Sequence, residues 1–435
     1  MFVRRIAVVG AGYVGLTTGA CLASLGHRVV CADINEDKVA ALQGGEVSIL
    51  EPGLAELVAE GLAAGRLEFV VGARNAVPDA EVVFLCVPTP MGEGGAADLA
   101  AVESVAAEVS ELLRPACVVV NKSTVPVGTA ARTAELLGRP DVAVVSNPEF
   151  LREGSAVADF LNPDRIVVGC DAQDAAERVA ALYARLGAPT VLTDAASAEM
   201  VKYAANCFLA MKLSYVNAVA ELCERLGADV LDVTEGIGYD RRIGQAFLSP
   251  GPGWGGSCLP KDTHALLQVA AAADFDFGLL RASLDTNTRQ RARMVDKVRD
   301  AVGGSLSGVR VGLLGLTFKA GTDDLRDSPA LAVAALLRAE GAELVGCDPG
   351  VCAAVPGMTD DVEVTDDPVK VASGAAAIVV LTEWPEFRVL DWGRLAEVVE
   401  HRVVIDTRNL LDADVLRRVG FEVRGVGRVP RDLLP

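Results

Sequence analysis

A strand, a glycine-rich turn, a helix and a second strand follow one another near the N-terminus and constrain the fold more than any other feature. The strand pattern of residues 6–9 leads into Gly10-Ala11-Gly12-Tyr13-Val14-Gly15, and a helix pattern follows over residues 16–25. A second strand pattern, residues 27–32, ends on Asp33. In such a unit the glycines let the backbone approach a pyrophosphate, and the acid can bond a ribose 2′-hydroxyl. We therefore predict a dinucleotide-binding unit that prefers NAD, because the 2′-phosphate of NADP would meet a carboxylate.

The alternation of strand and helix patterns continues and predicts an α/β fold. The strand patterns 82–87, 117–121 and 142–146 each end in a polar loop. Ligands of open parallel sheets lie beyond the carboxyl ends of the strands. The carboxylates Glu149 and Glu153, which follow the last of these strands, are therefore predicted to lie at a site.

The middle of the chain predicts one long helix. Residues 197–226 contain neither Gly nor Pro, which allows a helix of about 45 Å. Lys202 and Asn206 are four residues apart and so lie on one face of it. A second α/β pattern starts at residue 309, after Gly303-Gly304-Ser305.

We expect two Rossmann-like doubly wound domains joined by a long central helix and a helical domain. The predicted boundaries give a dinucleotide-binding domain over residues 1–195, a central helical domain over 196–303, and a C-terminal α/β domain over 304–435.

Composition excludes several classes of partner. The net charge of −19 argues against a general affinity for nucleic acid or acidic membranes. The longest apolar runs have the length of strands, and the N-terminus enters a strand pattern without a signal peptide, so we expect a cytoplasmic protein with no membrane span. The ten cysteines form no C-x-x-C pair and the three histidines are scattered, which predicts reduced thiols and no metal site.

One cysteine has the setting of a nucleophile. Gly255 and Gly256 precede Cys258, and Pro260 suits the first turn of a helix that continues to residue 267. The N–H groups and dipole at a helix N-terminus favour a thiolate. Most cysteines are inert packing residues, but the glycines and the charged neighbours Lys261 and Asp262 favour catalysis here.

These motifs together resemble the nucleotide-sugar 6-dehydrogenases. The resemblance covers essentially the full length and is carried by residues 10–15, 122–126, 147–151, 162–165, 202–206, 255–262 and 318–319. Within that family, residues 251–254 and 161–165 are more similar to the UDP-glucose branch than to the GDP-mannose branch. Trp254 stands where the family pattern leads us to expect another aromatic residue.

The resemblance implies a four-electron oxidation of a sugar C6 alcohol to a carboxylate, with two NAD per sugar. A thiolate can trap the intermediate aldehyde as a thiohemiacetal, whose oxidation gives a thioester that water hydrolyses. Cys258 is the predicted nucleophile, and Lys202 and Asn206 are predicted to hold the oxyanion. Asp262, with Thr124 and a water, is the candidate for proton transfer in the first step, and Glu149 for activating water.

The resemblance also implies the binding residues. Cofactor contacts are predicted for Gly10, Gly12, Tyr13, Val14, Gly15, Asp33, Lys38, Thr89, Thr124, Glu153, Lys261 and Arg326. Contacts to the UDP-sugar are predicted for Glu149, Phe150, Leu151, Lys202, Asn206, Arg242, Phe247, Ser249, Gly255, Lys319 and Arg408. Lys319 and Arg408 would hold the diphosphate from the C-terminal domain. Arg242 would reach the neighbouring subunit's site, which implies at least a homodimer.

Three alternatives stay open at this point. Another nucleotide-sugar dehydrogenase, such as one for GDP-mannose, would share the chemistry. A two-electron hydroxyacid dehydrogenase would share the architecture, with a helix-borne lysine and asparagine, but would not need Cys258. A catalytically silent NAD-dependent regulator would need none of Cys258, Lys202, Asn206 and Asp262. The sequence also leaves open which carboxylate acts in which step.

Overall fold

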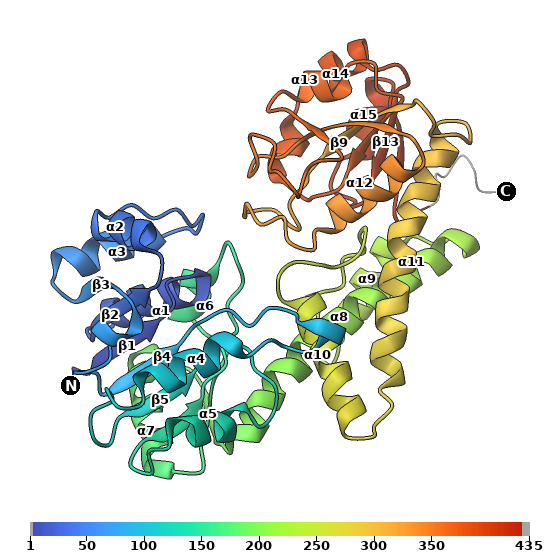
Figure 1. Cartoon of the computed structure of the whole chain (residues 1–435). Helices are drawn as coiled ribbons and strands as arrows, with labels where there is room; N and C mark the ends of the chain where they lie inside the picture. Colours follow the sequence, from blue (N-terminus) through green and yellow to red (C-terminus); the bar gives the residue numbers. More distant parts are fainter. Residues whose placement is uncertain (1–2, 429–435) are drawn as a thin grey trace. The chain divides into compact units, whose positions relative to one another are not determined.

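The computed structural model describes residues 3–428, which form two compact units (Figure 1). The first unit contains the residues up to 205 together with 264–275, and the second contains 206–263 and the residues from 276 onward. Each unit has its own parallel sheet. The division into three domains stays a prediction.

The first unit is built on an eight-stranded sheet in the order β3-β2-β1-β4-β5-β6-β7-β8. All neighbouring strands are parallel except β6 and β7. The first six strands follow the order of dinucleotide-binding folds, which confirms the predicted Rossmann-like architecture. The strands are β1 Arg5–Val9, β2 Arg28–Asp33, β3 Leu67–Val71, β4 Val82–Leu85, β5 Val118–Asn121, β6 Ala143–Ser146, β7 Ile166–Gly169 and β8 Thr190–Thr193.

Helices cover both faces of this sheet (Figure 1). One buried apolar cluster joins one face to α1 Tyr13–Ser24, α3 Leu54–Ala63, α6 Ala156–Leu161 and α7 Gln173–Ala180. A second cluster joins the other face to α4 Ala100–Val109 and α5 Thr129–Leu137. The remaining short elements are α2 Glu36–Gln43 and the 3-10 turns η1 Ala73–Asn75, η2 Glu93–Gly95 and η3 Ala181–Leu186. Because the sheet is buried on both faces, its central strands read as continuous apolar runs.

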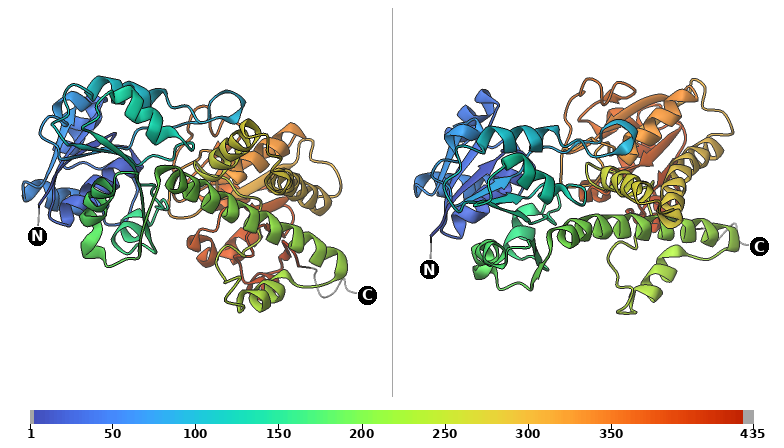
Figure 2. Two further views of the ribbon diagram at one scale, coloured as in Figure 1. Left: turned by 90° about the horizontal axis from the view of Figure 1, so that it is seen from below. Right: turned by 60° about the horizontal axis from the view of Figure 1, so that its bottom comes forward.

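The predicted long helix is present as α8 Ala195–Leu226, a single helix of 32 residues and about 48 Å (Figure 2). It begins in the first unit and ends in the second. Three more helices follow it, α9 Val230–Gly238, α10 Leu259–Ala272 and α11 Gly278–Ala301. The last of these is a helix of 24 residues with no proline in it.

The sheet of the second unit has six strands in the order β11-β10-β9-β12-β13-β14, and every neighbouring pair is parallel. This is the same order as that of the first six strands of the first sheet. Its strands are β9 Arg310–Leu314, β10 Glu343–Cys347, β11 Glu363–Val364, β12 Ala377–Val380, β13 Val403–Asp406 and β14 Glu422–Gly425. α11 and α12 Pro329–Ala339 pack on one face. The other face carries α13 Pro368–Ala372, η4 Pro385–Val389, α14 Trp392–Val398 and α15 Ala413–Arg418.

A buried carboxylate ties the strand-end loops of the second sheet together. Asp348 Oδ2 accepts hydrogen bonds from the backbone N–H groups of Leu316 and Thr317 at 2.7 and 2.9 Å. It also accepts from Thr317 Oγ1 at 2.8 Å and from Trp384 Nε1 at 3.1 Å. The loops after β9, β10 and β12 are therefore held by one oxygen atom.

Among residues 3–428, no helix combines the length and the apolar character that crossing a bilayer requires.

Replacing Asp348 tests this anchor. We expect Asp348→Ala to lower the free energy of unfolding by roughly 3 kcal/mol, because several buried donors lose their acceptor. Urea denaturation followed by circular dichroism measures the change. Asp361→Ala removes an exposed carboxylate on the same sheet's edge and is the control. Equal midpoints for the two variants would contradict the anchoring role.

Candidate active site

The glycine turn after β1 meets the requirements of a dinucleotide site. Gly10 has a φ of +96°, and a Cβ there would lie 2.6 Å from the Cys86 carbonyl oxygen. A Cβ on Gly15 would lie 1.7 Å from the Gly10 oxygen, so neither position accepts a side chain. Gly12 is the N-cap of α1, and nothing lies within 4 Å of a Cβ built on it. The turn therefore leaves open space at a helix N-terminus, which fits the pyrophosphate of NAD.

Asp33 is oriented beside this turn by three donors. Its Oδ2 accepts from Ala11 N at 3.0 Å and from Lys38 Nζ at 3.0 Å, and its Oδ1 accepts from Asn35 N at 3.0 Å. Burial alone would raise the pKa of Asp33, but the hydrogen bonds and the Lys38 charge outweigh it and lower the pKa. A fixed, ionised carboxylate at this strand end suits the ribose hydroxyls of NAD. Lys38 lies against Asp33 as its counter-ion.

Tyr13 connects the start of α1 to the loop that carries Glu153. Its hydroxyl donates a short hydrogen bond to the buried Glu51 carboxylate and accepts from Gly154 N at 2.8 Å. Burial and the Glu51 charge raise the pKa of Tyr13. Val14 is partly buried and packs on the apolar core of the first sheet. The predicted cofactor residues of these two segments are thus held at one end of the sheet.

The loops after β4 and β5 are joined by two of the predicted residues. Thr89 Oγ1 donates to the Thr124 carbonyl oxygen at 2.9 Å. Thr124, Lys202 and Glu199 line one small cavity. Glu199, which was not predicted, accepts from the N–H groups of Gly128 and Ala130 at 2.7 and 2.8 Å and so caps α5.

Glu149 and Lys202 form a buried ion pair. Lys202 Nζ lies 2.9 Å from Glu149 Oε1 and donates to the Glu149 carbonyl oxygen at 2.8 Å. Glu149 Oε2 accepts from Leu151 N at 2.6 Å. Burial would raise the pKa of Glu149, but Lys202 and the backbone donor lower it. The ring of Phe150 lies 5.4 Å from Lys202 Nζ, so the predicted residues 149–151 and Lys202 are brought together.

Sequence reasoning missed the buried Lys122 below this pair. Lys122 Nζ donates to Asn147 Oδ1 at 3.1 Å, and the Tyr183 hydroxyl donates to the same oxygen at 2.6 Å. Burial lowers the pKa of Lys122 to about 8, although the Glu149 charge opposes the shift. The sequence signal was a lysine directly after the buried strand Val118–Asn121, within the motif 122–126.

Cys258 lies at the start of α10, as predicted. Its carbonyl oxygen accepts from Asp262 N at 2.9 Å, which makes it the N-cap residue, and its side chain is exposed. A Cβ on Gly255 would lie 2.0 Å from the Asp327 oxygen. Gly256 has a φ of +84°. Both glycines are therefore required for the chain to deliver Cys258 to the helix.

Asp262 connects α10 to α8. It is completely buried, its Oδ2 accepts from Asn206 Nδ2 at 2.6 Å, and its Oδ1 lies 2.6 Å from Lys261 Nζ. The spacing of Lys202 and Asn206 along one helix is also as predicted. Both predicted oxyanion donors, Lys202 and Asn206, are thus paired with a predicted carboxylate.

Three buried amide side chains hold the loop that precedes Cys258, and none was predicted. Asn217 Oδ1 accepts from Gly251 N at 2.9 Å, and Gln290 Nε2 donates to the Gly251 oxygen at 2.7 Å. Asn287 bonds the N–H and the carbonyl oxygen of Trp254 at 2.8 and 2.9 Å. The sequence signal for two of them was an amide side chain, Asn287 or Gln290, on the buried face of α11.

The remaining residues of this loop differ in exposure. Phe247 has a φ of +61° and is half-buried, whereas Ser249 is exposed. Trp254 is buried and donates its indole N–H to Ser214 Oγ at 2.9 Å, which accounts for the aromatic residue there.

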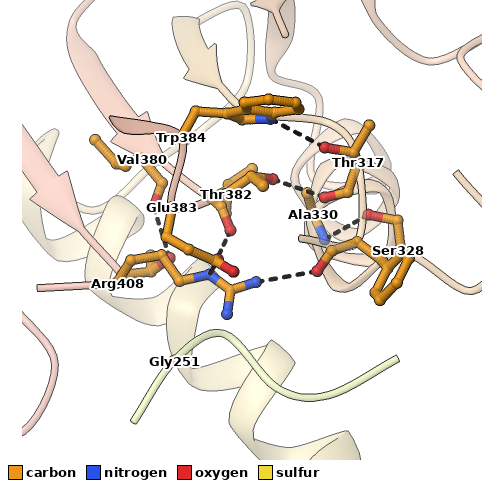
Figure 3. Close-up of polar contacts among 12 residues, drawn as sticks. Gly251, Thr317, Ser328, Ala330, Val380, Thr382, Glu383, Trp384 and Arg408 are labelled. Carbon is orange, nitrogen blue, oxygen red and sulfur yellow. Dashed lines mark hydrogen bonds and ion pairs between the residues drawn. The ribbon is translucent and has the colours of Figure 1, made fainter. Parts of the chain in front are cut away.

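Arg408 is held at the carboxyl ends of the second sheet (Figure 3). Its Nε donates to the Leu381 oxygen at 2.8 Å and its Nη2 to the Phe318 oxygen at 3.4 Å. A Cβ on Gly251 would lie 3.1 Å from Arg408 Nη1, so the loop approaches the guanidinium closely. Lys319, next to Phe318, is half-buried.

The other two predicted arginines lie in local pairs. Arg326 pairs with Asp324 at 2.7 Å, and Arg242 pairs with Asp240 at 2.6 Å. The Arg242 side chain is 89% exposed. Among residues 3–428, no group of three or more His, Cys, Asp or Glu side chains could hold a metal ion.

Three family models match the chain along its length. All carry the description UDP-glucose/GDP-mannose dehydrogenase family. The NAD binding domain matches residues 4–187, the central domain matches 196–289, and the UDP binding domain matches 312–413.

Individual relatives agree with these matches. A UDP-glucose 6-dehydrogenase of Rhizobium meliloti is 44% identical over 98% of this chain and 99% of its own length. A solved UDP-glucose dehydrogenase from Pyrobaculum islandicum is 37% identical, covers 98% of both chains and superposes with a TM-score of 0.89. A UDP-D-ManNAc dehydrogenase from Pyrococcus horikoshii is 31% identical, with 98% and 99% coverage and a TM-score of 0.87.

The geometry at Asp33 predicts cofactor preference. We expect kcat/KM to be roughly 100-fold higher with NAD than with NADP, because the added phosphate would meet a fixed carboxylate. Asp33→Asn should reduce the preference at least tenfold by removing the charge. Asp37→Asn, an exposed site on α2, is the matched control. Comparable kcat/KM values for both cofactors in the unaltered enzyme would refute this role.

The buried Lys122 predicts a pH dependence of stability. Its pKa is about 8 in the folded chain and about 10.5 in the unfolded chain. Between these values the unfolded chain holds a proton that the folded chain has released, so stability rises with pH. Relative to Lys122→Met, the wild type should gain about 2–3 kcal/mol between pH 7.5 and 10 in urea titrations.

Lys370→Met removes an exposed lysine of α13 and controls for the general loss of positive charge. A difference between wild type and Lys122→Met that stays flat over this pH range would show that Lys122 is not desolvated.

Proposed function

Because this chain belongs to the UDP-glucose/GDP-mannose dehydrogenase family, we propose that it catalyses the NAD-dependent oxidation of UDP-glucose to UDP-glucuronate. The chain is a dehydrogenase with NAD as its cofactor and a domain that binds UDP. The observation that carries the proposal is the exposed Cys258 at the N-terminus of α10, one turn from the buried Asp262. A simple two-electron dehydrogenase would not need this thiol.

The cofactor would be held by the glycine turn, Asp33 and the loops that carry Thr89, Thr124 and Glu153. Bound NAD would supply the hydride acceptor for both oxidations. Lys261 and Arg326 are the further cofactor contacts that we propose.

The UDP-sugar would be held by cations and by the loop before Cys258. Lys319 and Arg408 would bind the diphosphate, since guanidinium and ammonium groups suit phosphate oxygens. Phe247, Ser249 and Gly255 belong to the loop that would enclose the sugar. The backbone bonds from Asn217, Asn287 and Gln290 fix this loop before any ligand binds.

The first oxidation needs a base for the C6 hydroxyl proton. Asp262 is the proposed acceptor, with Thr124 and a water, and loss of the proton and a hydride gives the C6 aldehyde. The Lys261 ammonium lies 2.6 Å from Asp262 Oδ1.

The second oxidation proceeds on Cys258. Its thiolate would add to the aldehyde carbon, and the resulting oxyanion would be held by Lys202 and Asn206. This thiohemiacetal oxyanion would lose a hydride to the oxidised cofactor and so give a thioester. Addition of water and departure of the thiolate release the carboxylate, with Glu149 as the proposed base for water.

A homodimer is the proposed assembly. Phe208, Tyr215 and Leu222 are exposed and recur every seven residues along α8, which suits packing against another helix. Arg242 is exposed near the end of α9 and would reach the neighbouring site.

A cytoplasmic location stays part of the proposal. The buried Cys21, Cys31, Cys86 and Cys117 are thiols, as expected of a reducing compartment.

A second candidate substrate comes from the solved relatives. The UDP-D-ManNAc dehydrogenase from Pyrococcus horikoshii differs from this chain at more than two thirds of positions but shares its fold. Initial rates with UDP-glucose, UDP-ManNAc and GDP-mannose separate the candidates. We expect UDP-glucose to give the highest kcat/KM, and a higher value for either of the others would replace it as the proposed substrate.

Cys258→Ser tests the covalent route. We expect its complete four-electron turnover to fall by at least about 1,000-fold, because the second oxidation loses its nucleophile, while UDP affinity stays within about twofold. Cys352→Ser alters another exposed thiol and is the control. Four-electron turnover at the wild-type rate in Cys258→Ser would reject the thioester.

Arg242→Ala tests the shared site. We expect KM for UDP-glucose to rise about tenfold, and Arg241→Ala, the exposed neighbour, to leave it unchanged. Co-refolding Arg242→Ala with Cys258→Ser should restore activity, because one site of each mixed dimer has both groups intact. Mixed dimers no more active than the parents would place Arg242 and Cys258 in the same subunit's site.

A further inference from the structure

Arg408 has an acidic neighbour that neither the sequence analysis nor the family match assigns to a role. Glu383 Oε2 lies 3.1 Å from Arg408 Nε. The two residues come from the ends of neighbouring parallel strands, since Glu383 follows β12 and Arg408 follows β13 (Figure 3). The Arg408 side chain is only 16% exposed and the Glu383 side chain 39%.

The contact between these two groups is electrostatic and not a hydrogen bond. Arg408 Nε directs its hydrogen to the Leu381 carbonyl oxygen at 2.8 Å, and Nη2 donates to the Phe318 oxygen. Glu383 Oε2 is buried, and no donor among residues 3–428 hydrogen bonds to it. The carboxylate therefore acts on Arg408 through its charge, at a point where solvent screening is reduced.

The backbone on both sides of Glu383 is fixed by buried hydrogen bonds (Figure 3). Thr382 Oγ1 donates to the Thr317 oxygen at 2.7 Å. Trp384 Nε1 donates to Thr317 Oγ1 and to Asp348 Oδ2, both at 3.1 Å. The Glu383 side chain thus extends from a segment that is anchored on both sides.

The other arginine pairs of the site differ from this one. Arg326 and Arg242 each bond an aspartate two residues earlier, through two nitrogens and the backbone N–H. Those pairs are local turns with exposed arginines. Glu383 and Arg408 are 25 positions apart in the chain, so their contact is a feature of the sheet and not of a turn.

We propose that Glu383 is a positioning residue that holds Arg408 toward the diphosphate and at the same time weakens diphosphate binding. The inference rests on the proposed role of Arg408 in that site. A bound diphosphate would lie near the fixed carboxylate as well as the guanidinium, so part of the attraction is cancelled. Substrate and product share the same nucleotide. The weaker attraction therefore keeps the product from binding too tightly to be released.

Glu383→Gln tests the proposal because it keeps the size of the side chain and removes the charge. We expect UDP to bind roughly three- to tenfold more tightly by titration calorimetry, as one nearby repulsive charge is lost. The gain should shrink at high salt. KM for UDP-glucose should fall, whereas kcat should stay level or decrease because the product leaves more slowly. Glu386→Gln, an exposed carboxylate three residues later, is the matched control.

Two further measurements separate charge from other effects. With uridine, which has no phosphate, Glu383→Gln should bind as the wild type does. In an Arg408→Ala background, adding Glu383→Gln should still tighten UDP binding, because the carboxylate repels the diphosphate directly. If Glu383→Gln does not fold, Glu383→Met replaces it in the same measurements, because it removes the charge and keeps a side chain of similar length.

Several outcomes would overturn the proposal. Weaker UDP binding by both charge-removing variants would show that support of the loop dominates. An equal gain with uridine would show a contact to the nucleoside. If the wild type binds UDP and Glu383→Gln binds it with the same affinity, this inference alone is rejected. A wild-type enzyme that does not bind UDP would instead reject the proposed function.

Discussion

The rest of the site depends on the buried carboxylate of Asp262. It lies in the first turn of α10, receives a hydrogen bond from Asn206 of α8, and pairs with Lys261. An unpaired carboxylate in a dry interior costs several kcal/mol, so the start of α10 cannot move away from Asn206 cheaply. Cys258 is the N-cap of that helix, and its position is therefore fixed by the same bond. The backbone position of the proposed nucleophile is thus set by the start of α10.

The donors proposed for the oxyanion are already engaged by the carboxylates proposed for proton transfer. Lys202 is bonded to Glu149, and Asn206 is bonded to Asp262. A negative charge that forms on the substrate must share these donors, so oxyanion stabilisation and carboxylate basicity are coupled. If Lys202 turned toward an oxyanion, as we propose, Glu149 would become a stronger base. The charge of Lys122 nearby limits the cost of that exchange.

Local patterns predicted most of the fold and the first residues of each motif. These features are encoded by residues a few positions apart. Examples are the strand patterns, the glycine turn with Asp33, and the N-cap position of Cys258. The residues that were missed act across the chain. Asn287 bonds Trp254, Gln290 bonds Gly251, Lys122 bonds Asn147, and Glu383 lies against Arg408. Asn287, Gln290 and Lys122 are buried only in the folded chain, and Glu383 meets Arg408 only there, so no local pattern indicates their role.

The claim that one thiol carries the sugar between two oxidations can be tested directly by mass spectrometry. Glu149→Gln is expected to slow hydrolysis, so mixing it with UDP-glucose and NAD should leave a UDP-glucuronyl thioester on the peptide that contains Cys258. The adduct should be absent from the double variant that also carries Cys258→Ser. Release of UDP-glucuronate at the wild-type rate by the double variant, with two NADH per sugar, would contradict the account.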